Sequence, residues 1–229
     1  MLRGAVFDFD GVIVDSHPLH VRAWKHFLDS VGKTVTEEQL LFALDGRKRD
    51  DILRHFMGEL EADQIIEYGL RKEQFFRKEA VHVRTADGLL NFLEDLQSEQ
   101  LALAIASSGG KSRIYFLLDR LGLRKFFRAV VTGDEVEQGK PHPAVFLMAA
   151  HRLGVDPTEV MAFEDAVSGV QAARSAGMKC VGIAQLDRAP ILLAAGANPV
   201  VPDFYSLSCS KLRELLSNGA GTRSMSTSR

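Results

Sequence analysis

Acidic side chains follow the first apolar run of the chain at a spacing that suits nucleophilic and acid–base chemistry. Asp8 and Asp10 come directly after the run Leu2–Phe7 and are separated by a single residue. Polar groups stand in the same place after three later apolar runs: Ser107 and Ser108 after the second, Lys140 beyond the third, and Glu164 with Asp165 after the fourth. Carboxylates, hydroxyls and a lysine are the groups that phosphoryl transfer needs, because that reaction depends on positioning and on charge stabilisation.

The carboxylates create a charge problem that a cation must solve. A phosphomonoester is about a dianion, and at an effective dielectric constant of about 20 each like-charge pair at about 4 Å costs roughly 4 kcal/mol. A hard divalent cation held by carboxylate and carbonyl oxygens removes that repulsion, and Mg²⁺ suits a site that shares its ligands with a phosphate. Lys140 adds a positive point charge, and Ser107 with the glycine-rich amides behind it can hold phosphoryl oxygens. The pattern therefore predicts a Mg²⁺-dependent phosphoryl-transfer site.

Buried parallel strands are the elements that must position these groups. Helical stretches separate four strong apolar runs and two weaker ones, an alternation that predicts an α/β protein with a doubly wound, Rossmann-like parallel sheet. In such a sheet, ligands bind outside the carboxyl ends of the strands, where the strand order reverses. The predicted strands are Leu2–Phe7, Leu101–Ala106, Ala129–Thr132 and Val160–Phe163, followed by Lys179–Ile183 and Pro199–Val201.

The segment after the first strand has a different pattern. Residues 15–82 contain helical patterns and no convincing strand, which indicates a helical cap inserted into the sheet domain. The domain prediction is a discontinuous catalytic core over 1–14 and 83–217, a cap over 15–82, and a disordered tail over 218–229. The predicted cap helices are Pro18–Val31, Glu37–Ala43, Asp50–Phe56 and Asp63–Glu79, the second of them opened by a capping box of Thr36 and Gln39.

Composition excludes several other classes of protein. The 229 residues carry 28 basic and 30 acidic side chains, a balance that argues against a nucleic-acid partner. Two cysteines cannot build a disulfide framework, and no apolar run approaches the roughly 18 residues needed to span a membrane. We therefore expect a soluble, cytoplasmic monomer or small homo-oligomer whose partner is a small phosphorylated metabolite.

Four motifs, in order, resemble those of the haloacid dehalogenase superfamily of phosphotransferases: DFDGVIVDS, IASS, GKPHPAVF and AFEDAVSGVQAARSAGM. The resemblance covers the chain to about Leu216 and implies a role for each matching residue. Asp8 would be the nucleophile that becomes an aspartyl phosphate, and Asp10 the general acid and base. Ser107, with Ser108 beside it, and Lys140 would bind the phosphoryl group. Mg²⁺ would be held by Asp8, Asp10 through its backbone carbonyl, Glu164 and Asp165.

The predicted cap resembles the β-phosphoglucomutase-like subfamily through Asp15-Ser16, His20, Arg22-Ala23-Trp24-Lys25, Gly46 and Arg49. By this resemblance Arg49 grips a second phosphate or anionic group of the substrate, and Lys72 matches a further cap lysine. His20 would help to position Asp10. The alternative for His20 is a helix-face histidine that packs on Trp24, four residues further along.

The resemblance leaves the choice among related functions open. The mutase itself has a Ser-Lys-Asn stretch after its phosphate-binding serine, where this chain has Gly109-Gly110-Lys111. This departure favours a phosphatase acting on a small phosphomonoester, with a sugar phosphate as the expected substrate. The nearest alternative is a β-phosphoglucomutase-type sugar phosphomutase. A non-catalytic sugar-phosphate sensor with the same pocket is a third possibility.

Overall fold

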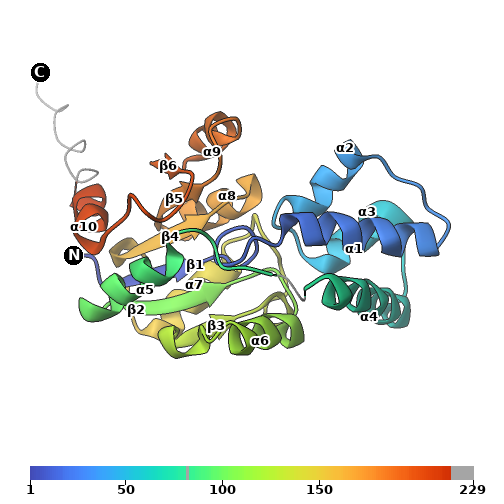
Figure 1. Ribbon diagram of the computed structural model, residues 1–229, viewed down its shortest axis with the longest axis horizontal. Helices are drawn as coiled ribbons and strands as arrows, with labels where there is room; N and C mark the ends of the chain where they lie inside the picture. Colours follow the sequence, from blue (N-terminus) through green and yellow to red (C-terminus); the bar gives the residue numbers. More distant parts are fainter. Residues whose placement is uncertain (81–82, 218–229) are drawn as a thin grey trace, which may run out of the picture.

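A six-stranded parallel sheet forms the centre of the computed structural model, which describes residues 1–80 and 83–217 (Figure 1). The strand order is β3-β2-β1-β4-β5-β6, so the chain direction across the sheet reverses beside β1. This arrangement confirms the predicted doubly wound α/β fold. The strands are β1 Gly4–Phe7, β2 Ala102–Ala106, β3 Ala129–Val131, β4 Val160–Glu164, β5 Lys179–Ile183 and β6 Val200–Val201.

Helices cover both faces of the sheet. One apolar core packs α5, α6 and α10 against one face, and a second core packs α7, α8 and α9 against the other. Because β1 is buried along its whole length, its sequence is a continuous apolar run. The helices are α5 Leu89–Ser98, α6 Lys111–Arg120, α7 Ala144–Leu153, α8 Val167–Ser175, α9 Ala189–Ala195 and α10 Cys209–Ser217, with 3₁₀ turns η3 Arg124–Phe126, η4 Gly133–Glu135 and η5 Pro157–Glu159.

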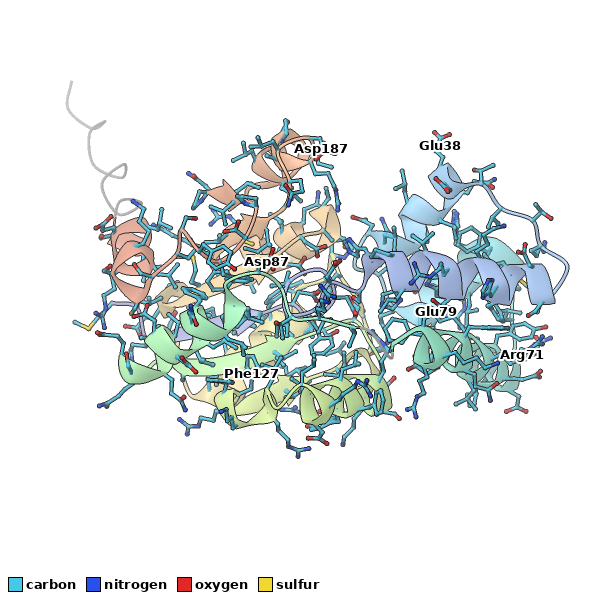
Figure 2. The ribbon with its side chains drawn as sticks, in the orientation of Figure 1. Glu38, Arg71, Glu79, Asp87, Phe127 and Asp187 are labelled. Carbon is cyan, nitrogen blue, oxygen red and sulfur yellow. The ribbon has the colours of Figure 1, made fainter. Side chains whose placement is uncertain are left out.

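A separate cluster of helices lies beside the sheet, at the right of Figure 1. It has an apolar core of its own, which includes Trp24, Phe27 and Leu53. Glu38 and Arg71 lie on its outer side, away from the sheet (Figure 2). Its elements are α1 His17–Ser30, α2 Glu37–Leu40, the 3₁₀ turn η1 Leu41–Leu44, α3 Arg49–Met57 and α4 Ala62–Glu79.

Several element ends differ from the prediction for identifiable reasons. The capping box of Thr36 and Gln39 is confirmed, but α2 tightens into a 3₁₀ turn after one turn. Helix α6 begins at Lys111, whose backbone N–H donates a hydrogen bond to the Asp134 carboxylate at 2.7 Å. That cap comes from a different strand end, so local sequence gives no signal of it.

Two further predictions concern membrane-spanning segments and the C-terminal tail. No helix within residues 1–80 and 83–217 is long and apolar enough to cross a membrane. The predicted disordered tail over 218–229 lies outside the described residues. The division into core and cap remains a prediction.

Candidate active site

The carboxyl ends of neighbouring strands bring the predicted site residues together. Strand β1 pairs with both β2 and β4, with Phe7 opposite Ile105 on one side and Phe163 on the other. The residues that follow these strands therefore share one edge of the sheet. A cavity of about 590 Å³ lies between this edge and the helical cluster. From the sheet edge it is lined by Asp8, Asp10, Ser107, Ser108, Arg113, Asp134 and Asp165, and from the cluster by His20, Trp24, Arg49, Lys72, Glu73 and Arg77, among others.

Lys140 is buried between two carboxylates at the base of this site. Its Nζ lies 2.5 Å from Asp8 Oδ1 and 2.5 Å from Glu164 Oε1, and its side chain is fully buried. Burial alone would lower the pKa of Lys140, but the two carboxylates outweigh that effect and raise it. Burial and the neighbouring carboxylates raise the pKa of Asp8 well above its ordinary value, against the lowering effect of Lys140. One fixed cation therefore offsets only part of the negative charge gathered here.

Three carboxylates offer the geometry of a divalent-cation site. Asp8, Glu164 and Asp165 each present an oxygen, and these oxygens all lie within 4.8 Å of one another. Glu164 Oε2 accepts hydrogen bonds from the backbone N–H groups of Asp165 and Ala166 at 2.9 and 3.1 Å. Asp165 Oδ2 is buried and accepts no well-aligned hydrogen bond, although His17 Nε2 lies 2.9 Å away. A set of hard oxygen donors with one unsatisfied buried oxygen fits Mg²⁺.

Gly169 is the residue that makes room for the Glu164 carboxylate, because a Cβ at this position of α8 would overlap it. We expect Gly169→Ala to lower the free energy of unfolding by about 1–3 kcal/mol, the usual cost of overpacking. This cost exceeds the roughly 1 kcal/mol that alanine gains over glycine inside a helix, since Lys140 and two backbone N–H groups hold Glu164 in place. Urea denaturation measures the change.

The matched control for Gly169→Ala is Gln171→Ala, at an exposed position of the same helix. It should leave the urea midpoint almost unchanged. Equal or higher stability of Gly169→Ala would mean that Glu164 moves freely, contrary to the packing described here.

The two serines after β2 have different surroundings. Ser107 is 1% exposed, and its Oγ accepts a hydrogen bond from the Gly109 N–H at 3.0 Å. The hydroxyl proton of Ser107 is not used in this bond, so the hydroxyl can donate it to a phosphoryl oxygen. Ser108 Oγ donates to the backbone carbonyl of Gly46 at 2.5 Å. Its hydroxyl therefore joins the sheet edge to the helical cluster, and Ser107 is the better placed of the two to bind phosphate.

Asp10 is held by four hydrogen bonds. Arg113 donates from both terminal nitrogens, Nη1 to Oδ1 at 2.6 Å and Nη2 to Oδ2 at 2.7 Å. Ser16 Oγ donates to Oδ1 at 2.7 Å, and His20 Nε2 lies 3.1 Å from the same oxygen. Burial alone would raise the pKa of Asp10, but Arg113 and His20 outweigh it and hold that pKa well below its ordinary value. Before a ligand binds, the site therefore favours the ionised form of Asp10.

His20 continues this network into the helical cluster. Its Nδ1 lies 2.9 Å from Lys72 Nζ. Burial, followed by the Lys72 charge, lowers the pKa of His20 to about 3, and burial with Arg113 lowers that of Lys72 to about 7. A neutral His20 with its proton on Nε2 can donate to Asp10 and accept from Lys72. The His20 ring lies 4.6 Å from the ring of Phe76, and His20 lines the cavity together with Asp10 and Lys72.

Arg49 reaches the cavity from the first turn of α3. Its Nε lies 3.4 Å from Asp50 Oδ1, and about a third of the side chain is exposed. A Cβ at Gly69 of α4 would overlap this guanidinium, so the glycine leaves a channel through which Arg49 enters the cavity. The guanidinium keeps donors for an anionic group of a ligand.

Comparison with known proteins shows the family to which this chain belongs. The family model described as haloacid dehalogenase-like hydrolase matches residues 5–183. The chain belongs to this family. The phosphorylated carbohydrates phosphatase of Thermotoga maritima is 35% identical over 87% of this chain and 94% of its own length. The β-phosphoglucomutase of Bacillus subtilis is 30% identical over 93% of this chain and 95% of its own length.

A solved structure supports the same fold. The β-phosphoglucomutase of Clostridium difficile has a TM-score of 0.85 over 96% of this chain and 99% of that one, at 24% identity. Together these findings confirm the expected superfamily and its β-phosphoglucomutase-like subfamily. The chain is thus an enzyme of this family, a phosphatase or a phosphomutase.

Several side chains of this haloacid dehalogenase-like hydrolase escaped the sequence analysis. Arg113 pairs with Asp10, His17 lies beside Asp165, and Glu73 lines the cavity from α4. Arg113 stands in a helix with ordinary amphipathic spacing, so nothing local marked it. A weak signal was available for Glu73, since it follows Lys72 directly.

Proposed function

We propose that this enzyme is a Mg²⁺-dependent phosphatase that cleaves a small phosphomonoester of a sugar through an aspartyl phosphate on Asp8. The observation that carries this proposal is that two carboxylates with different partners line one cavity. Asp8 has Lys140 on one oxygen, and Asp10 has donors on both oxygens. A nucleophile and a separately held acid–base group are what hydrolysis through a covalent intermediate requires. The family's phosphatase from Thermotoga maritima supports the same choice.

Each step has a residue of this chain to perform it. Asp8 uses the oxygen that Lys140 leaves free, Oδ2, to attack phosphorus, and the bond from phosphorus to the ester oxygen breaks. The negative charge of the bound phosphate favours the protonated form of Asp10, which gives its proton to the leaving oxygen. A water molecule then gives a proton to Asp10 and attacks phosphorus of the aspartyl phosphate, which releases inorganic phosphate and restores Asp8. Ser107 and Lys140 hold the phosphoryl oxygens throughout.

The proposed metal ligands are Asp8, Glu164 and Asp165, with the backbone carbonyl of Asp10. Mg²⁺ would supply the positive charge that lets a phosphate dianion approach these carboxylates. The close grouping of the Asp8, Glu164 and Asp165 oxygens supports this assignment, because Mg²⁺ prefers hard oxygen donors.

Residues 15–82 are proposed to act as a cap that excludes bulk water from the reaction. Contacts across the junction support this role. Ser168 Oγ donates to the Asp45 carbonyl, and Arg77 Nη2 donates to Ser112 Oγ at 2.6 Å. Within the cap, His20 and Lys72 would keep Asp10 in place, and Arg49 would bind a substrate group distant from the reacting phosphate. Residues 1–14 and 83–217 would form the catalytic core.

A phosphate-release screen over phosphorylated sugars, other small phosphomonoesters and 4-nitrophenyl phosphate tests this proposal. We expect release of inorganic phosphate from at least one sugar phosphate in the presence of Mg²⁺. Chelation of the metal should abolish the release, and added Mg²⁺ should restore it. Tight binding of a sugar phosphate without turnover of any compound would contradict the proposal and would favour the sensor function.

The second candidate function is a sugar phosphomutase. The β-phosphoglucomutase relative from Bacillus subtilis and the Arg49 guanidinium in the cavity favour it, since a mutase binds an intermediate with two phosphates. Gly109 and Gly110 supply no side chain to hold the second phosphate, and the Lys111 ammonium lies 5.9 Å from the ring of Tyr115. A hexose 1-phosphate with a bisphosphate primer separates the two functions. A mutase yields the 6-phosphate with little free phosphate, whereas a phosphatase releases phosphate in proportion to substrate consumed.

A further inference from the structure

Arg113 is a buried arginine that the proposed mechanism has not yet used. It occupies the first turn of α6, directly after the phosphate-binding segment that follows β2, and its side chain is 6% exposed. Both terminal nitrogens donate to the two oxygens of Asp10 in parallel, at 2.6 and 2.7 Å. A guanidinium fork of this kind fixes the plane of a carboxylate as well as its position.

The other side-chain donors to Asp10 in the described part of the chain reach only one of its two oxygens. Ser16 Oγ and His20 Nε2 both approach Oδ1. These two contacts leave Oδ2 without a donor of its own. The hydrogen bond from Arg113 Nη2 holds Oδ2, so the guanidinium is the group that contacts both oxygens of Asp10.

Contacts with the cap hold Arg113 itself. The centre of its guanidinium lies 5.0 Å from the ring of Phe76, and its Nε lies 3.8 Å from Glu73 Oε2. Both partners belong to α4, whose end faces α6 across the junction (Figure 1). The guanidinium is therefore fixed by the cap on one side and fixes Asp10 of the core on the other.

We propose that Arg113 is the positioning residue for the proton transfers of Asp10. This inference rests on the proposed function. Arg113 orients Oδ2 of Asp10 toward the leaving oxygen in the first step and toward the attacking water in the second. Its hydrogen bonds go to Asp10 and none is made to Asp8, so its loss should act first on the proton-transfer group.

The leaving group of the substrate distinguishes this role from a merely structural one. Cleavage of an alkyl phosphate needs a proton on the leaving oxygen, whereas 4-nitrophenyl phosphate releases a phenolate that is stable without one. Hydrolysis of the aspartyl phosphate needs Asp10 with either substrate. A variant with a misplaced Asp10 should therefore still transfer the phosphoryl group from 4-nitrophenyl phosphate to Asp8, and then stall.

The experiment compares Arg113→Gln and Arg113→Lys with the unaltered enzyme in rapid-mixing kinetics. The substrates are 4-nitrophenyl phosphate and the sugar phosphate that the screen shows to be turned over fastest. For both variants we expect a burst of about one nitrophenolate per enzyme at a rate within about tenfold of the unaltered enzyme. On the sugar phosphate kcat should fall by about 10²-fold or more, the range for a positioned acid–base group, with KM within about threefold. Arg124→Gln, an exposed arginine in the turn after α6, is the matched control and should change neither.

A double variant keeps the test decisive if single variants fold poorly. Asp10→Asn with Arg113→Gln places two neutral amides together, so no buried charge is left alone. If Arg113 acts through Asp10, the double variant should match Asp10→Asn in kcat within about threefold. The inference would be overturned if the burst rate with 4-nitrophenyl phosphate fell by the same factor as kcat on the sugar phosphate. It would also be overturned if kcat of the double variant fell below that of Asp10→Asn by the full factor that Arg113→Gln causes alone. Absence of turnover by the unaltered enzyme would instead overturn the proposed function.

Discussion

Asp8→Asn is expected to lower kcat by at least about 10⁴-fold while the protein stays folded. An amide cannot form the acyl phosphate, so the reaction loses its covalent intermediate, and losses of up to about 10⁶-fold follow removal of a nucleophile in other enzymes. The fold should tolerate the change because Lys140 Nζ keeps its second partner, Glu164, at 2.5 Å. Phosphate release from the best sugar phosphate measures the activity, and thermal unfolding measures the fold.

Asp187→Asn is the matched control for Asp8→Asn. Asp187 is exposed on the turn before α9 (Figure 2) and is not among the residues that line the cavity, so its replacement should leave kcat within about twofold of the unaltered enzyme. Activity of Asp8→Asn within tenfold of the unaltered enzyme would contradict the assignment of Asp8 as the nucleophile. A low melting temperature together with low activity would show that the carboxylate supports the fold, and refolding with Mg²⁺ before the assay would then separate the two effects.

Lys140→Met is expected to lower both activity and stability. Methionine fills most of the volume but leaves Asp8 and Glu164 without the charge that lies 2.5 Å from each. Breaking a buried ion pair from one side costs about 3–5 kcal/mol. Loss of one group that stabilises transferring charge typically lowers kcat by about 10²–10³-fold. Urea denaturation without metal and phosphate release with Mg²⁺ measure the two effects.

Metal binding gives a second readout for Lys140→Met. In the variant the cation would be the main positive charge facing three carboxylates, so a given concentration of Mg²⁺ should raise the melting temperature more than it does in the unaltered protein. Lys125→Met, at an exposed position in the turn η3, should behave like the unaltered protein. Melting that is insensitive to Mg²⁺ in both Lys140→Met and the unaltered protein would count against the proposed metal ligands.

Local patterns were sufficient for the architecture and for one wall of the site. Apolar runs predicted the strands, because strands buried on both faces contain little else. Parallel strands end at one edge, so the polar groups that follow them must meet, and the structure brings Asp8, Lys140, Glu164 and Asp165 together as expected. The same logic could not give the start of α6, where a carboxylate from a later turn caps the helix.

The partners of individual side chains depend on how α6 and the helices of residues 15–82 pack against the sheet. Arg113 and Asp10 are 103 residues apart, and their pairing exists only because α6 follows a strand beside β1. The roles of Ser107 and Ser108 likewise separate only when the Gly46 carbonyl is placed next to one of them. The sequence determines which residues follow the carboxyl end of each strand. Which of them touch across the junction is decided by the packing of distant segments, because a hydrogen bond requires atoms to approach within about 3 Å.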